Sequence, residues 1–277
     1  MFLALNPVIV GGRSTWPKLA EVAAAAGFPG VEIPIVDAMK STPDEVKAVL
    51  KANGVRAGAI GLPVDIRGDE ATFERDLVGL DRASSFASAI GCPRMMTWIL
   101  SSSELPKSEQ RKVMLRRLSK VSNVLERSHV RLGLEFLGPL HIRTRYPNEF
   151  IWRMNEMLAF AKECGGNCGL MLDSWHWHHA RATPEDIIKA GRDAIVHVHL
   201  ADAPDLPADK IRDNERLIPG EGIVNWKGFF GALKEIGYAD ATSPEVFGRG
   251  LKDMPLAEAT SLVYRDTFKL MRSLGVA

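Results

Sequence analysis

Four side chains that could bind a metal ion come at the ends of apolar runs in the second half of the chain. Two of the runs are Leu132–Leu134 and Leu170–Leu172, and the other two lie near 198 and 243. The four side chains are Glu135, Asp173, His199 and Glu245. Carboxylates and an imidazole are hard or borderline ligands, so the set suits one divalent ion such as Mn²⁺, Zn²⁺, Co²⁺ or Mg²⁺.

A single glutamate at the end of a strand more often forms a loop salt bridge or caps a helix. A carboxylate buried alone is costly, however, and a shared cation offsets that cost for all four groups. We therefore interpret the set as a metal site. We expect His197 to point to the opposite face of its strand and to be a packed histidine.

His176 and Arg216 lie close to these residues in the sequence. His176 comes three residues after Asp173, where it could donate a hydrogen bond to a substrate oxygen. Arg216 begins the segment Arg216–Gly222, whose proline and glycines favour a tight loop. Such a loop could hold the arginine over a pocket, although a surface arginine is an equal alternative.

Three further basic residues, His141, Arg143 and Arg145, alternate in the loop after Phe136. In an extended segment they would share one face and could clamp an anion, but a solvated basic loop fits the pattern better. Trp175 and Trp177 either line the pocket or pack in the core. His178 and His179 are expected at the surface.

Eight short apolar runs alternate with amphipathic segments along the chain. We expect strands at 2–5, 31–35, 55–62, 95–100, 131–136, 169–173, 195–200 and 242–247. Helices are expected at 14–27, 42–54, 69–90, 108–127, 148–163, 226–236 and 256–274. A further helix is expected to start at residue 183. Continuous apolar strands alternating with helices predict a parallel sheet with both faces covered, and eight repeats favour a closed barrel. The prediction is an α/β protein with a single (β/α)8 TIM barrel over residues 1–277. An open doubly wound sheet is the alternative.

The composition is that of an ordinary globular protein. Of 277 residues, 46% are hydrophobic, and 35 Lys and Arg balance 34 Asp and Glu. The near-zero net charge argues against a dedicated nucleic-acid binder, and no apolar run is long enough to cross a membrane. Three unpaired cysteines and an apolar start without a basic leader favour a cytoplasmic protein.

Several motifs together resemble the xylose-isomerase-like barrels of the sugar phosphate isomerase/epimerase type. The motifs are Leu172–His178, His197–His199, Arg216–Gly222 and Ser243–Phe247. They look most like the inosose (2-keto-myo-inositol) isomerase branch and, more loosely, the ketose 3-epimerases. The segment Phe136–His141 departs from those epimerases because it lacks their second glutamate, which argues against a free ketohexose as substrate.

The resemblance implies one divalent ion held by Glu135, Asp173, His199 and Glu245. It also implies that Glu135 and Glu245 are catalytic bases and that His176 and Arg216 contact the substrate. The predicted function is a metal-dependent sugar or polyol isomerase or epimerase, acting by proton transfer through a metal-stabilised enediolate on a hydroxy-ketone.

Other functions are less well supported. A metal-dependent dehydratase or other lyase is the nearest alternative, followed by a non-catalytic polyol-binding barrel. An endonuclease-IV-like nuclease would need histidines on the early strands, and residues 1–128 contain none. The expected partner is a small sugar or polyol, with no nucleic acid or membrane, and a homo-oligomer is left open.

Overall fold

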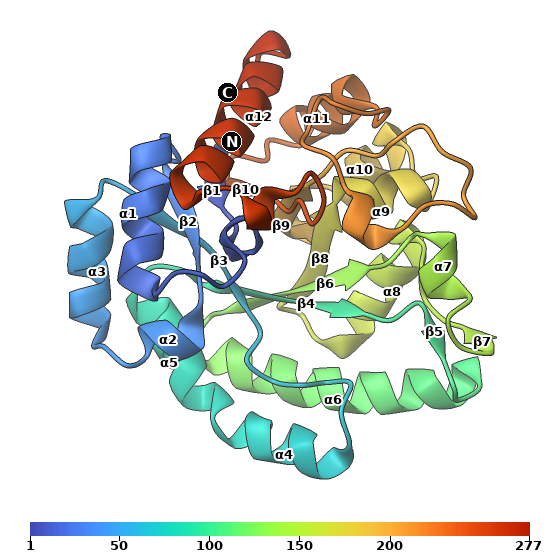
Figure 1. Ribbon diagram of the computed structural model, residues 1–277. Helices are drawn as coiled ribbons and strands as arrows, with labels where there is room; N and C mark the ends of the chain where they lie inside the picture. Colours follow the sequence, from blue (N-terminus) through green and yellow to red (C-terminus); the bar gives the residue numbers. More distant parts are fainter.

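The computed structural model describes residues 1–277 and contains a closed barrel of eight parallel strands (Figure 1). The strand order around the barrel is β1-β10-β9-β8-β6-β4-β3-β2. The strands are β1 (Phe2–Leu5), β2 (Gly30–Ile33), β3 (Arg56–Gly61), β4 (Arg94–Ile99), β6 (Arg131–Phe136), β8 (Cys168–Asp173), β9 (Ile195–Leu200) and β10 (Ala241–Pro244). The predicted fold class, a (β/α)8 TIM barrel, is confirmed.

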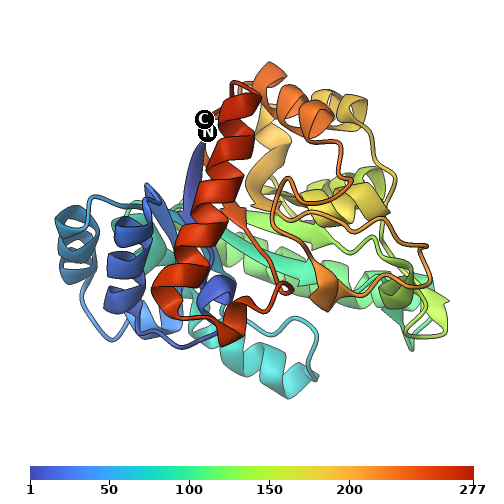
Figure 2. The same ribbon diagram turned by 45° about the horizontal axis from the view of Figure 1, so that its top comes forward.

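Helices surround the barrel. They are α1 (Trp16–Ala26), α2 (Ile35–Ala38), α3 (Pro43–Ala52), α4 (Glu70–Val78), α5 (Leu80–Ala89), α6 (Lys107–Arg127), α7 (Leu140–Arg143), α8 (Met154–Cys164), α9 (Ser174–His179), α10 (Pro184–Ala190), α11 (Trp226–Glu235) and α12 (Leu256–Ser273). Short 3₁₀ turns lie at Pro7–Val10, Arg192–Ala194, Asp213–Glu215 and Leu251–Asp253. The last helix, α12, packs against α1, which brings the two chain termini together (Figure 2).

Two expected helices differ from the structure. The segment 69–90 forms two helices, α4 and α5, separated at Gly79, where a residue without a side chain weakens the helix. The helix expected from residue 148 starts at Met154 instead. Asn148–Glu149 form strand β7, which pairs antiparallel with β5 (Ser102–Ser103). The Asn148 amide also donates to the Ser103 and Glu104 carbonyls, so local side-chain bonding competes with the helix.

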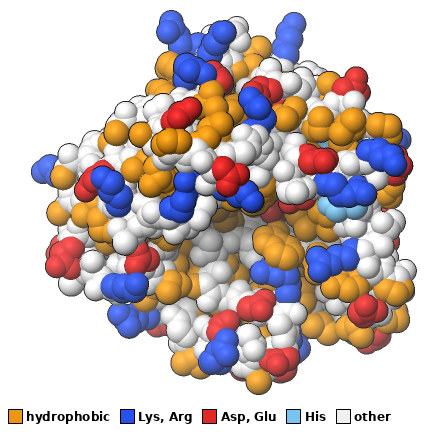
Figure 3. All heavy atoms as spheres, in the orientation of Figure 1, with side chains coloured by type: hydrophobic (Ala, Val, Ile, Leu, Met, Phe, Trp, Pro, Cys, Tyr) orange, Lys and Arg blue, Asp and Glu red, His pale blue; other side chains and the backbone are white.

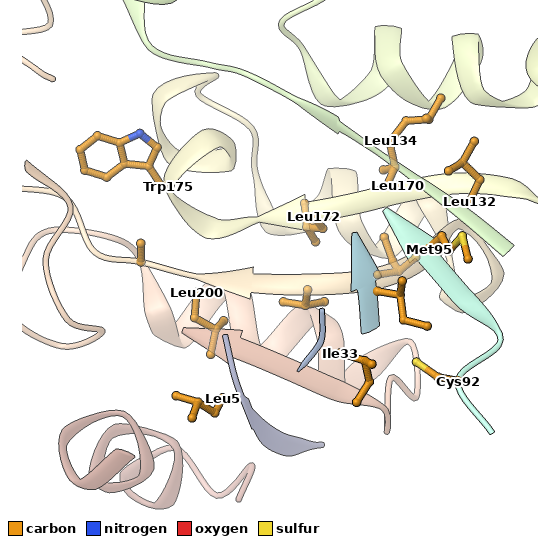
Figure 4. Packing of buried hydrophobic residues seen from close by; sticks show 14 of the residues in the cluster. Leu5, Ile33, Cys92, Met95, Leu132, Leu134, Leu170, Leu172, Trp175 and Leu200 are labelled. Atoms are coloured by element: carbon orange, nitrogen blue, oxygen red, sulfur yellow. The ribbon is translucent and has the colours of Figure 1, made fainter. Parts of the chain in front are cut away.

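A continuous hydrophobic core joins the strands to the helices. Leu134, Leu170 and Leu200, on three neighbouring strands, are completely buried and belong to this core (Figure 4). On the molecular face drawn in Figure 3, positive and negative side chains are interspersed. The core therefore fixes the strand ends, and the strand ends in turn position the polar residues described next.

Candidate metal centre and substrate pocket

The structure brings Glu135, Asp173, His199 and Glu245 together at the carboxyl ends of four neighbouring strands. One ligand atom from each lies within 4.8 Å of every other. The strand register explains this, because Asp173 of β8 pairs directly with His199 of β9. Glu245 follows β10, and its backbone N–H donates to the Leu200 carbonyl, 2.9 Å away.

The chemistry of this cluster fits a divalent metal ion. Three carboxylates and one imidazole converge, and all but Glu245 are less than a tenth exposed. Glu135 Oε1 and His199 Nδ1 are buried without a hydrogen-bond partner. Buried polar atoms are normally paired, so two unpaired ligand atoms facing a set of hard donors indicate a cation site.

Arg216 lies in the same cluster. Its Nη1 donates to Asp173 Oδ2 at 2.9 Å and to Glu245 Oε2 at 2.7 Å. Its Nε and Nη2 donate to Asp213 Oδ1. Burial by itself would lower the pKa of the guanidinium, but the surrounding carboxylates raise it. The arginine is therefore charged, and it offsets part of the negative charge of the site.

The same environment shifts the pKa values of the carboxyl groups in opposite directions. Burial, reinforced by the charges of Glu245 and Asp173, raises the pKa of Glu135 well above its ordinary value. Burial opposes ionisation of Glu245 too, but the charges of His199 and Arg216 outweigh it and lower the pKa.

His176 lies on α9, one turn beyond Asp173. Its Nδ1 accepts a hydrogen bond from the Gly138 N–H at 3.3 Å, and its Nε2 lies 3.1 Å from Arg216 Nη2. Gly138 permits this contact because a Cβ there would come within 2.4 Å of the His176 carbonyl oxygen. Burial and the positive charge of Arg216 lower the pKa of His176 well below its ordinary value, so the ring is neutral at pH 7.

Asp202 anchors the loop that carries Arg216. Its carboxylate accepts from the Gly220 N–H at 2.8 Å, the Val224 N–H at 2.9 Å and the Trp226 indole at 2.6 Å. These bonds tie the segment that follows Arg216 to the end of β9. Sequence reasoning missed Asp202, although an aspartate directly after an apolar strand was a usable signal.

A cavity of about 360 Å³ opens above the cluster. Its polar lining includes Glu135, His176, Arg216, Glu245 and Asp213. Trp98 and Phe247 also line it, and they are 40% and 42% exposed. Exposed aromatic rings beside polar groups suit a small polyol, which has both C–H faces and hydroxyl groups.

The three basic residues after β6 do not share a face. His141 of the short helix α7 and Arg145, two residues beyond its end, both line the cavity. Arg143 instead stacks on the Trp152 ring at 3.9 Å. Trp175 and Trp177 are buried and pack in the core. His178 and His179 are half-buried, so the expected surface placement was wrong.

The expectation that His197 faces away from His199 was also wrong. Residues two apart on a strand point to the same face, and both histidines contact Glu32 Oε1 of β2, at 3.0 and 2.9 Å. Burial would raise the pKa of Glu32, but the charge of His199 and hydrogen bonds from both histidines lower it far below its ordinary value. Sequence reasoning missed Glu32, whose signal was a charged residue inside the apolar run Val31–Ile35.

The family model described as "Xylose isomerase-like TIM barrel" matches residues 20–274. The chain belongs to this family. It is 26% identical over 255 residues to an inosose isomerase of Halalkalibacterium halodurans, covering 89% of this chain and 88% of that one. A 3-dehydroshikimate dehydratase of Pseudomonas putida is 25% identical over 250 residues, covering 87% of this chain and 37% of the relative.

Two solved structures share the whole fold. A xylose isomerase domain protein from Alicyclobacillus acidocaldarius superposes with a TM-score of 0.89 at 24% identity, covering 99% of both chains. The IOLI protein with a bound zinc atom superposes with a TM-score of 0.83 at 21% identity, again covering 99% of both. None of the helices in the present structure is both long and apolar enough to span a membrane.

Proposed function

We propose that this protein is a metal-dependent isomerase or epimerase of a small hydroxy-ketone polyol of the keto-inositol type. The observation that carries the proposal is the convergence of Glu135, Asp173, His199 and Glu245 within 4.8 Å of one another, beside a cavity of about 360 Å³ that Glu135 and Glu245 line. The family membership and the near full-length similarity to an inosose isomerase support it.

Glu135, Asp173, His199 and Glu245 would hold one divalent ion. When bound, that ion supplies Lewis-acid stabilisation of negative charge on a substrate oxygen. Glu135 and Glu245 both line the cavity, where one would remove the proton next to the carbonyl and the other would return it. Return to the neighbouring carbon gives an isomer, and return to the opposite face gives an epimer.

His176 and Arg216 would orient the substrate. With Nδ1 engaged by the Gly138 N–H, the neutral His176 ring presents Nε2 toward the cavity, 3.7 Å from Glu135 Oε1. Nε2 also lies 3.1 Å from Arg216 Nη2, so the two side chains stand together where a substrate oxygen in the cavity could contact both. Arg216 adds a fixed positive charge close to Glu245.

Deuterium exchange tests the proposal directly. Protein loaded with Mn²⁺ or Zn²⁺ is incubated in D₂O with a panel of keto-inositols and ketoses, and incorporation is followed by NMR. We expect deuterium at the carbon next to the carbonyl. Glu245→Gln should lower the exchange rate by about 10²–10⁴-fold without unfolding the protein, the range for a lost general base. Glu109→Gln, which removes an exposed carboxylate of α6, is the matched control.

Exchange in Glu245→Gln at the wild-type rate would remove this residue from the mechanism. A product that has one water molecule less than the substrate would instead favour the second candidate, a dehydratase acting on a sugar acid or keto-inositol. The similarity to a 3-dehydroshikimate dehydratase supports that alternative. Metal binding with no exchange on any compound would indicate a polyol-binding barrel.

A further inference from the structure

Glu32 reaches across the barrel interior to His199. Glu32 lies on β2, whereas His199 lies on β9, on another part of the barrel wall. The Glu32 side chain is 5% exposed, and its Oε1 lies 2.9 Å from His199 Nε2. This is a short, buried contact between a carboxylate and one nitrogen of an imidazole.

The other ring nitrogen of His199 faces the candidate metal centre. Nδ1 lies 3.4 Å from Glu245 Oε1 and has no hydrogen-bond partner. A neutral imidazole carries a proton on one nitrogen and a lone pair on the other. The partner of Nε2 therefore decides whether Nδ1 can act as a ligand.

Two groups approach Nε2, and their geometry favours Glu32 as its partner. The Asn6 amide nitrogen lies 3.4 Å away, and the Asn6 oxygen already accepts from the Val8 N–H at 2.9 Å. The carboxylate contact is 0.5 Å shorter (3.4 minus 2.9) and is charge-assisted, which makes it roughly twice as strong as a neutral hydrogen bond. Nε2 therefore donates to Glu32.

We propose that Glu32 is a positioning residue that fixes the His199 ring and its tautomer, so that Nδ1 presents its lone pair to the metal centre. A histidine ligand commonly donates its second N–H to a carboxylate, and loss of that partner typically costs about 10–100-fold in metal affinity. The inference rests on the metal site of the proposed function.

His197 completes the arrangement. Its Nε2 lies 3.0 Å from the same Glu32 oxygen, and Ser243 Oγ lies 3.2 Å from Nε2. A carboxylate this deeply buried needs more than one donor to remain in place. His197 therefore keeps the Glu32 carboxylate in position, and Glu32 in turn positions His199. Substitution of His197 should lower the metal affinity less than substitution of Glu32.

The first test measures metal affinity. The Kd for Zn²⁺ is determined by competition with a chromophoric chelator for wild type, Glu32→Gln, Glu32→Leu and His197→Gln, and folding is checked by near-UV circular dichroism. We expect Glu32→Leu to lose about 10–100-fold in affinity and Glu32→Gln and His197→Gln to lose less. Glu21→Gln, an exposed carboxylate of α1, is the control. A folded Glu32→Leu with wild-type affinity overturns the inference.

The second test needs no substitution at Glu32. Long-range ¹H–¹⁵N NMR spectra of wild-type protein report the tautomer of each histidine, and His199→Gln assigns the signal. After loading with zinc, we expect His199 with a protonated Nε2 and with Nδ1 bound to the metal. A His199 bound through Nε2 overturns this inference alone. A wild-type protein that binds no zinc overturns the proposed function as well.

Discussion

The two halves of the barrel differ in the side chains that they place in its interior. Strands β6, β8 and β9 and the end of β10 supply all four residues of the candidate metal centre, whereas β1 to β4 supply mainly apolar side chains. Glu32 is the charged residue of the first half that is buried inside the barrel. A buried charge is tolerated only where partners are close, and the second half provides them for Glu32 through His197 and His199. We infer that the first half mainly stabilises the fold and the second half carries the chemistry.

Removal of a large core side chain in the first half should have the greatest effect on stability. Phe73 of α4 is completely buried. Phe73→Ala should lower the free energy of unfolding by about 3–5 kcal/mol, through lost apolar contact and a remaining cavity. Urea denaturation measures this change, and Phe73→Leu should cost less. The Zn²⁺ affinity of the folded variant should stay unchanged, and a parallel loss of affinity would contradict the division between the halves.

Metal binding to the four residues of the second half should raise the free energy of unfolding, and metal removal should lower it again. At a free concentration about 100-fold above Kd, Zn²⁺ or Mn²⁺ should raise the free energy of unfolding by roughly 2.7 kcal/mol, because the ion binds the native state. A chelator should reverse the gain. In Glu135→Gln a neutral amide replaces one ligand, so the gain at the same concentration should be smaller. An equal gain in both proteins would place the ion elsewhere.

The smallest effect should come from a surface ion pair of the first half. Hydrogen bonds from Arg116 and Arg117 lower the pKa of Glu70 from 4.5 to about 2. Because the folded-state pKa is lowered, this carboxylate contributes stability above pH 4.5 that is lost as the pH falls toward 2. Glu70→Gln should flatten the decline of stability across this range, as measured by urea denaturation at several pH values. Glu109→Gln provides the reference, and an identical slope for Glu70→Gln would contradict the prediction.

Local patterns predicted most elements because helix and strand periodicities are local properties. The alternation of eight strands and helices predicted the barrel, and the residues that follow the strands predicted the cluster of Glu135, Asp173, His199 and Glu245. Their roles, and the treatment of residues 1–277 as a single domain, stay predictions. The start of the helix expected from residue 148 could not be predicted in the same way. It depends on the pairing of β5 with β7, which are distant in the sequence.

The sequence by itself determined which side chains stand at the ends of the strands, since an apolar run followed by a polar residue is visible without a structure. Only the tertiary structure decided which distant side chains share a hydrogen bond. Glu32 and His199 are 167 residues apart, and barrel closure alone brings them within 2.9 Å. The physical reason is that strand register and closure depend on packing over the whole barrel, which no local stretch of sequence encodes.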